Sequence, residues 1–290
     1  MEGKEIRMAR QPDERTIQIN GAKLTYVEMG SGEPLVFVHG SVGDYRTFAP
    51  QFEAFSKFYR IVSYSRRFHP PNVWTDPDPV YSPASHADDL AAFIRALGLV
   101  RPHIVASSYG GYCAIILATK SPGLFRSLVL GEPPILPLLR NTEAGRLALK
   151  NFEENAIKPS REAYLRGNME DGLRKFMDGI LGRKGAFDQI PQPQRTELLR
   201  FAPEMKLEML ADPRHYLPTP TGQELAQLSV PVLLVGGDRS PNMFRIIMDE
   251  LVRWLPNNER VIIPNAGHSM HAGNPDAYNR VVLEFLAKHP

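Results

Sequence analysis

Residues His103–Gly111 read HIVASSYGG and decide the fold. The first four residues are an apolar run, which predicts a short strand buried in a parallel sheet. The apolar stretch 112–118 follows the two glycines and predicts a buried helix. A serine therefore lies on a sharp turn between a strand and a helix, which is the context that a nucleophile elbow requires.

Two adjacent serines compete for the central position of this turn. The usual elbow pattern is G-x-S-x-G, and its outer residues are small because the nucleophile has a strained backbone. A pattern centred on Ser108 has Ala106 and Gly110 at the outer positions, whereas one centred on Ser107 would place a valine and a tyrosine there. We therefore predict Ser108 as the nucleophile. The alternative is a turn serine without a chemical role.

Composition limits the class of protein. The chain has 290 residues, of which 43% are hydrophobic, so it can bury one large core or a core with an insertion. A formal net charge of +2 does not point to nucleic acid or to an anionic membrane. Cys113 is the one cysteine, which excludes an internal disulfide and fits a reducing compartment.

Targeting signals are missing from the sequence pattern. The first ten residues, MEGKEIRMAR, are charged and precede no apolar segment, so we do not expect a secretory signal. No apolar run approaches the length of a membrane span. The sequence thus predicts a cytoplasmic protein, either a monomer or a homodimer, with a small-molecule substrate and no nucleic-acid partner.

The rest of the chain alternates between strand and helix patterns. Further predicted strands span 16–20, 23–28, 34–39, 60–65, 125–131, 230–235 and 260–264. Ser82 followed by Pro83 predicts the start of one helix, and Asn274 followed by Pro275 predicts the start of another. This alternation predicts a mostly parallel eight-stranded α/β sheet with helices on both faces.

The strand pattern stops between Pro133 and Leu228. Segments 172–181 and 194–210 have the apolar spacing of amphipathic helices, and prolines interrupt them. We interpret this region as a helical insertion after the sixth strand. The predicted domains are a core over 1–132 and 229–290, and a helical unit over 133–228.

The ends of two late strands carry an acid and a base. Asp238 follows the strand 230–235, and His268 follows the strand 260–264. Parallel sheets place their ligand sites at the carboxyl ends of the strands, so both side chains are expected near Ser108. His268 would accept the serine proton, and Asp238 would orient the imidazole. The order Ser, Asp, His is the one expected for a hydrolase with an elbow serine.

Attack on a carbonyl also needs donors for the developing oxyanion. The backbone N–H of Tyr109, directly after the nucleophile, is the first expected donor. The second is the backbone N–H of Ser41, in the turn His39-Gly40-Ser41 that follows the third strand. His39 itself is interpreted as a structural residue that binds this loop.

Other candidates receive second rank. Glu132 follows the strand beside the elbow and is an alternative acid, although two prolines after it favour a structural role. His271 is an alternative base. Arg66 and Arg67 either form a solvated surface or bind a substrate carboxylate. The sequence has no metal-ligand spacing and no dinucleotide motif, so no cofactor is expected.

These motifs together resemble the α/β-hydrolase fold superfamily, in its branch with a serine nucleophile. The resemblance rests on HGSVG at 39–43, ASSYGG at 106–111, GGD at 236–238 and AGH at 266–268. It implies that 133–228 is a helical cap over the pocket. Serine at position 108 argues against epoxide hydrolases and haloalkane dehalogenases of this fold, which use an aspartate there.

The leading prediction is a cofactor-free serine hydrolase, similar to carboxylesterases and lactonases. Ser108 would form an acyl-enzyme with an ester, a lactone or a related acyl compound. Two alternatives stay open. One is a hydrolase that cleaves a carbon–carbon bond with the same triad, and the other is a non-hydrolytic lyase, cyclase or dioxygenase of this fold.

Overall fold

The computed structural model describes residues 12–75, 80–212 and 218–290. We expected no secretory signal in the first ten residues, and these residues lie outside the described part of the chain. The eight strands are β1 (Arg15–Ile19), β2 (Ala22–Met29), β3 (Glu33–Val38), β4 (Tyr59–Tyr64), β5 (His103–Ser107), β6 (Ser127–Gly131), β7 (Val232–Gly237) and β8 (Asn258–Ile263).

The strands form one sheet in the order β1-β2-β4-β3-β5-β6-β7-β8. The strands from β4 to β8 in this order pair in parallel, and the hairpin β1–β2 is attached to β4 by antiparallel pairing. The predicted mostly parallel eight-stranded α/β fold is thus confirmed, with a mixed edge. The elbow strand β5 lies in the middle of the sheet, between β3 and β6.

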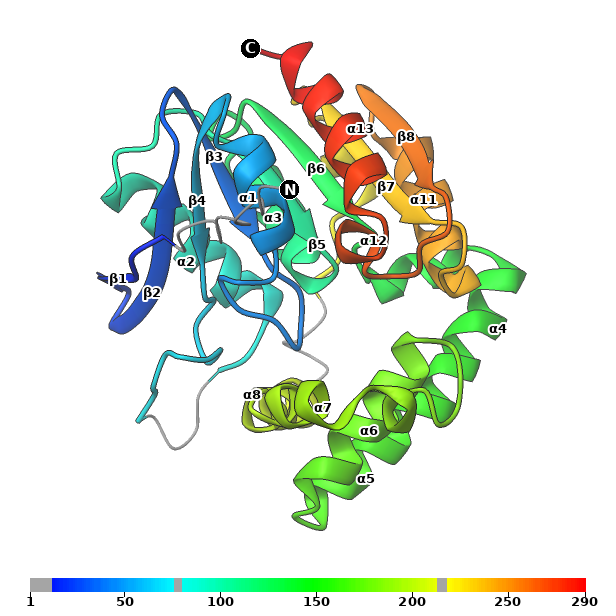
Figure 1. The fold of residues 1–290 in the computed structure, drawn as a ribbon. Helices are drawn as coiled ribbons and strands as arrows, with labels where there is room; N and C mark the ends of the chain where they lie inside the picture. Colours follow the sequence, from blue (N-terminus) through cyan, green and yellow to red (C-terminus); the bar gives the residue numbers. More distant parts are fainter. Residues whose placement is uncertain (1–11, 76–79, 213–217) are drawn as a thin grey trace, which may run out of the picture.

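Helices cover both faces of this sheet (Figure 1). They are α1 (Ala49–Phe55), α2 (Pro83–Ala96), α3 (Tyr109–Lys120), α11 (Asn242–Trp254), α12 (Met270–Gly273) and α13 (Pro275–Ala287). Side chains of β3 alternate between the two layers: Leu35 and Phe37 pack with α1 and α13, whereas Val36 and Val38 pack with α2, α3 and α11. A strand buried on both faces needs this continuous apolar run.

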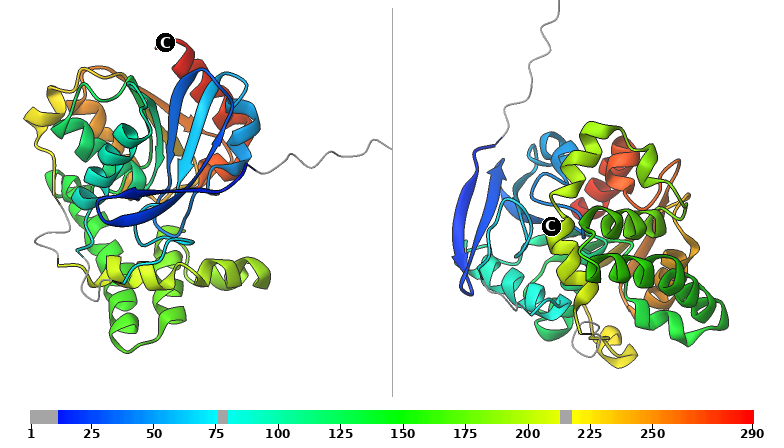
Figure 2. Two further views of the ribbon diagram at one scale, coloured as in Figure 1. Left: turned by 90° about the vertical axis from the view of Figure 1, so that its left-hand side faces the viewer. Right: turned by 90° about the horizontal axis from the view of Figure 1, so that it is seen from below.

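Between β6 and β7 the described residues contain helices and no strand. The helices are η1 (Leu136–Asn141), α4 (Glu143–Phe152), the π-helix η2 (Glu153–Ile157), α5 (Lys158–Leu165), α6 (Met169–Ile180), η3 (Phe187–Gln189), α7 (Gln192–Leu199), α8 (Ala202–Leu210) and α10 (Gly222–Ala226). Helices α4–α8 lie together below the sheet in Figure 1 and cover its underside in Figure 2. The position agrees with a helical insertion after the sixth strand.

The local signals at helix ends agree with the structure in two places and differ in one. Ser82 caps α2 through the Ser85 N–H, and Asn274 caps α13 through the Ala277 N–H. The predicted helix 194–210 is instead two helices, α7 and α8, that meet before Pro203. Proline lacks an N–H and fits only the first turn of a helix, which explains why a new helix begins there.

Within the described residues, no helix has the length and apolar character that crossing a membrane requires.

Candidate active site

The predicted nucleophile lies on the turn between β5 and α3. Ser108 follows β5, precedes α3 and has a φ of 51°, a backbone angle that residues other than glycine rarely adopt. Its backbone N–H donates to the Gly131 carbonyl at 2.7 Å, and its side chain remains partly exposed. Strain of this kind persists where surrounding contacts impose it, and here it presents the hydroxyl at the edge of the sheet.

The predicted base reaches this hydroxyl. His268 follows β8, and its Nε2 lies 2.9 Å from the Ser108 Oγ. The imidazole is buried and stacks on the Phe244 ring, with 4.1 Å between centroids and 14° between planes. The structure therefore brings together two side chains that are 160 positions apart in the sequence.

The prediction that Asp238 orients this imidazole is wrong. The His268 Nδ1 lies 2.7 Å from Oε2 of Glu132, which follows β6 and is buried. Asp238 is exposed and accepts hydrogen bonds from the backbone N–H groups of Asn265 and Ala266 instead. The N–H of Asn265, together with that of Ala266 and the Arg239 charge, lowers the pKa of Asp238. Asp238 thus fixes the loop that carries His268 rather than the ring itself.

Each oxygen of the Glu132 carboxylate has a hydrogen-bond partner. Its second oxygen, Oε1, accepts the Gly237 N–H at 2.9 Å, and its own backbone has a φ of 45°. A Cβ at Gly237 would lie 2.3 Å from the Ala266 carbonyl oxygen, so only glycine lets the loop after β7 approach the loop of His268. Sequence reasoning ranked Glu132 second, and its signal was its place after the strand next to the elbow.

The turn after β3 lies against the nucleophile. A Cβ at Gly40 would lie 2.8 Å from the Ser108 Cβ and 3.5 Å from its Oγ. Ser41 follows directly, and its hydroxyl donates to Glu208 Oε2 at 2.7 Å. Tyr109 is the first residue of α3, where backbone N–H groups lack acceptors within the helix. Tyr109 thus directly follows Ser108, and Ser41 directly follows the glycine that packs against Ser108.

The two adjacent arginines have separate environments. Arg67 donates to the Asp89 carboxylate at 2.6 and 2.7 Å and to the Asn20 carbonyl, in a salt bridge at the edge of the sheet. Arg66 is buried and donates to backbone carbonyls. Neither forms the solvated pair that was one reading of the sequence. The alternative base His271 packs against Phe48, away from the nucleophile.

A buried polar junction joins the helical insertion to the core. From α8, Glu204 meets the Tyr81 hydroxyl and the His69 ring, and Glu208 binds Ser41. The His69 Nδ1 faces the Gly43 carbonyl at 2.9 Å and must carry its proton there, because a carbonyl can only accept. Its Nε2 is then an acceptor that faces the Glu204 Oε1 at 3.1 Å. A protonated Glu204 fits this arrangement.

This junction is expected to become less stabilising as pH rises. Burial raises the pKa of Glu204 from 4.5 to about 7. The folded state therefore keeps this proton to higher pH than the unfolded chain does. The contribution of Glu204 to stability is thus fully present below about 4.5 and is lost as pH rises to about 7. Glu204→Gln mimics the protonated acid at every pH. The unfolding free energy of this variant relative to the wild type should therefore be higher at pH 8 than at pH 5, by about 1–3 kcal/mol.

Urea unfolding at both pH values measures this difference. The matched control is Glu284→Gln, since Glu284 is an exposed glutamate of α13. The control should unfold as the wild type does at each pH. A Glu204→Gln protein whose stability relative to the wild type is the same at pH 5 and pH 8 would show that Glu204 titrates as an ordinary carboxylate.

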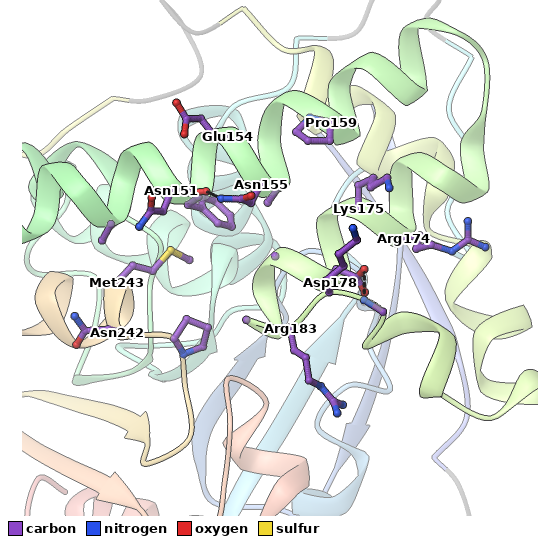
Figure 3. A pocket seen from close by; sticks show the side chains of 18 of the residues that line it. Asn151, Glu154, Asn155, Pro159, Arg174, Lys175, Asp178, Arg183, Asn242 and Met243 are labelled. Atoms are coloured by element: carbon purple, nitrogen blue, oxygen red, sulfur yellow. Dashed lines mark hydrogen bonds between the residues drawn. The ribbon is translucent and has the colours of Figure 1, made fainter.

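A separate cavity of about 720 Å³ lies between the helical insertion and the core. It opens between α4–η2, α6 and the start of α11, and its charged lining includes Arg174, Lys175, Asp178 and Arg183 (Figure 3). Neither Ser108 nor His268 lines it. In the described part of the chain, no cluster of three or more metal-binding side chains occurs.

The comparisons with known proteins show the family of this chain. The chain belongs to the alpha/beta hydrolase family, whose profile matches residues 35–281. It is 25% identical to the serine hydrolase BPHL of Mus musculus, over 93% of this chain and 85% of the mouse protein. It is 26% identical to the 2-hydroxy-6-oxononadienedioate/2-hydroxy-6-oxononatrienedioate hydrolase 2 of Pseudomonas putida, over 91% of each chain.

A solved structure shows the same fold. The thermophilic esterase from Thermogutta terrifontis superposes with a TM-score of 0.73 at 21% sequence identity, over 96% of this chain and 100% of the esterase. The fold class and a hydrolase of the alpha/beta family are thereby established for this chain.

Proposed function

We propose that the chain is a serine hydrolase that cleaves an ester, a lactone or a related acyl bond of a small molecule. The observation that carries the proposal is the continuous chain of contacts Ser108–His268–Glu132, with distances of 2.9 and 2.7 Å. A serine hydroxyl needs a base within hydrogen-bond reach, and that base needs a group that fixes its tautomer. Both requirements are met by buried side chains.

The reaction follows from the hydrogen-bond pattern. Glu132 accepts a hydrogen bond from the Nδ1–H of His268, so the neutral imidazole presents the lone pair of Nε2 to the Ser108 hydroxyl. Ser108 Oγ attacks the carbonyl carbon while its proton moves to Nε2. The proton then passes to the leaving group, and an acyl-enzyme forms. In the second half of the reaction, His268 takes a proton from water as the water attacks the acyl carbon. The Ser108 oxygen then leaves with this proton, and the acid is released.

The oxyanion of each tetrahedral intermediate needs donors that are already in position. The backbone N–H groups of Ser41 and Tyr109 are the proposed donors, since Tyr109 directly follows Ser108 and Ser41 directly follows Gly40, which packs against Ser108. The Tyr109 N–H also lies at the positive end of the α3 dipole, which favours negative charge. The helical insertion would act as a cap, because α8 reaches the oxyanion turn through Ser41 and Glu208.

A carbon–carbon bond hydrolase is the second candidate. It is favoured by the 26% identity to the Pseudomonas putida hydrolase, which extends over 91% of both chains. The same serine, histidine and acid would serve both reactions, so the substrate distinguishes the candidates. Turnover of a panel of acyl esters, lactones and vinylogous diketones would separate them.

Labelling with a fluorophosphonate tests the proposed chemistry. The probe should modify Ser108 alone, because its phosphorus mimics the carbonyl carbon and its oxygen occupies the oxyanion site. Peptide mass spectrometry locates the label, and the heat-denatured protein is the control. A native protein that hydrolyses none of the substrates and takes no label would favour the non-hydrolytic reactions of this fold.

A further inference from the structure

Arg66 lies behind the turn that carries the proposed oxyanion donor. Its side chain is 1% exposed, and it follows β4, next to β3 in the sheet. The guanidinium donates from Nε to the His39 carbonyl and from Nη2 to the Gly40 carbonyl, both at 3.1 Å. One buried cation thus holds two consecutive peptide groups of this turn.

The same residue also fixes the tautomer of His39. The backbone N–H of Arg66 donates to the His39 Nε2 at 2.9 Å, so this nitrogen is an acceptor. The His39 proton is then on Nδ1 and points to the Gly40 carbonyl oxygen at 2.7 Å. Burial, together with the charges of His69 and Arg66, lowers the pKa of His39, which keeps the ring neutral. The Gly40 oxygen therefore accepts two hydrogen bonds.

The geometry of the peptide bond carries this arrangement to the reacting centre. In a trans peptide the C=O and the N–H point in opposite directions, and the Gly40 carbonyl shares its peptide plane with the Ser41 N–H. Donors that hold the oxygen on one side therefore hold the N–H on the other. Two donors on one carbonyl also polarise the peptide and make its N–H a stronger donor.

Arg66 interacts electrostatically with Glu204, but its charge has few other partners. Within residues 12–75, 80–212 and 218–290 it forms no ion pair, and its Nη1 has no hydrogen-bond acceptor. Its guanidinium carbon lies 4.8 Å from the centre of the Tyr109 ring, which is a cation–π contact. A buried cation is costly unless it is paired. A negative charge that develops at the oxyanion site would be attracted to it.

We propose that Arg66 is a positioning residue of the oxyanion hole, which orients and polarises the Gly40–Ser41 peptide through the Gly40 carbonyl. This inference rests on the proposed serine-hydrolase function. Arg66 acts on the transition state and not on substrate recognition, so its loss should lower kcat more than it raises KM. The neighbouring Arg67 donates its hydrogen bonds to Asp89 and Asn20 instead of this turn and provides a matched control.

The test compares p-nitrophenyl acetate with its thionoester, in which sulfur replaces the carbonyl oxygen. Sulfur is a weak hydrogen-bond acceptor, so the ratio of oxoester to thionoester turnover reports how much the reaction depends on oxyanion donors. In Arg66→Met we expect the oxoester kcat to fall by about 10- to 100-fold and this ratio to shrink by about tenfold. In Arg67→Met the ratio should equal that of the wild type.

Arg66→Lys keeps the proposal testable if the methionine variant fails to fold. A lysine retains the charge but donates from a single point, so its ratio should lie between those of the wild type and Arg66→Met. A wild-type ratio in either folded variant would overturn the positioning role, and so would a lysine variant that is as unfolded as the methionine variant. Failure of the proposed function would be visible without the Arg66 variants, because the wild type itself would then show no turnover that is lost on substitution of Ser108.

Discussion

Ser108→Ala is expected to lower kcat by up to about 10⁶ with little change in KM. The alanine removes the oxygen that forms the acyl-enzyme and leaves only the oxyanion donors and the binding contacts. The His268 imidazole would then have no hydroxyl at its Nε2, which is 2.9 Å from the Ser108 Oγ in the wild type. Steady-state turnover of an activated ester, with an active-site titration of the wild type, measures the loss.

The adjacent serine supplies the control for this experiment. Ser107 ends β5, is buried and differs from Ser108 by one position in the sequence. Ser107→Ala should keep turnover within about tenfold of the wild type, because its hydroxyl is not the one that faces His268. A Ser108→Ala protein that retains a tenth of the wild-type rate would rule out an acyl-enzyme at this position.

The fold and the contact between Ser108 and His268 could be predicted from the sequence because their signals are local. A strand, a serine turn and an apolar helix follow one another within His103–Lys120, and the structure has β5 and α3 there. His268 lies in the loop that follows its strand, β8. Parallel strands bring their carboxyl ends to one edge, so chain order was sufficient to bring Ser108 and His268 together.

The acid could not be predicted in the same way, because it depends on lateral distances across the sheet. β6 lies directly beside β5, whereas β7 is one strand further away. A glutamate after β6 is near enough to reach the His268 ring, and Asp238 instead binds the backbone of the loop that precedes this ring. Both acids follow a strand and precede a loop, so the sequence pattern alone does not distinguish their roles.

The environment of Arg66 was equally beyond the sequence. Two adjacent arginines in a loop suggest a solvated surface, but the backbone of Arg66 pairs with the His39 ring and turns its side chain inward. The burial of this region depends on α8, whose Glu204 is 138 positions later in the chain. Contacts between segments so distant have no counterpart in local periodicity.

Glu132→Gln should lower kcat by about 10⁴, and it is the sharpest test of which acid serves His268. A glutamine amide that donates to Nδ1 would move the imidazole proton to Nε2. The ring would then present a donor to the Ser108 hydroxyl, and it could not accept the serine proton. Comparison of kcat with the wild type, at equal thermal stability, isolates this change of tautomer from a loss of folding.

Asp238→Asn is the matched substitution at Asp238, the acid that the order Ser, Asp, His in the sequence predicts. Asp238 is exposed and accepts hydrogen bonds from the Asn265 and Ala266 N–H groups, and an asparagine side chain still offers one acceptor oxygen to them. Turnover should therefore stay within about tenfold of the wild type. The reverse result, with a severe loss in Asp238→Asn and a mild one in Glu132→Gln, would mean that His268 changes its partner during the reaction. Because both substitutions replace one oxygen by nitrogen, their difference reports position alone.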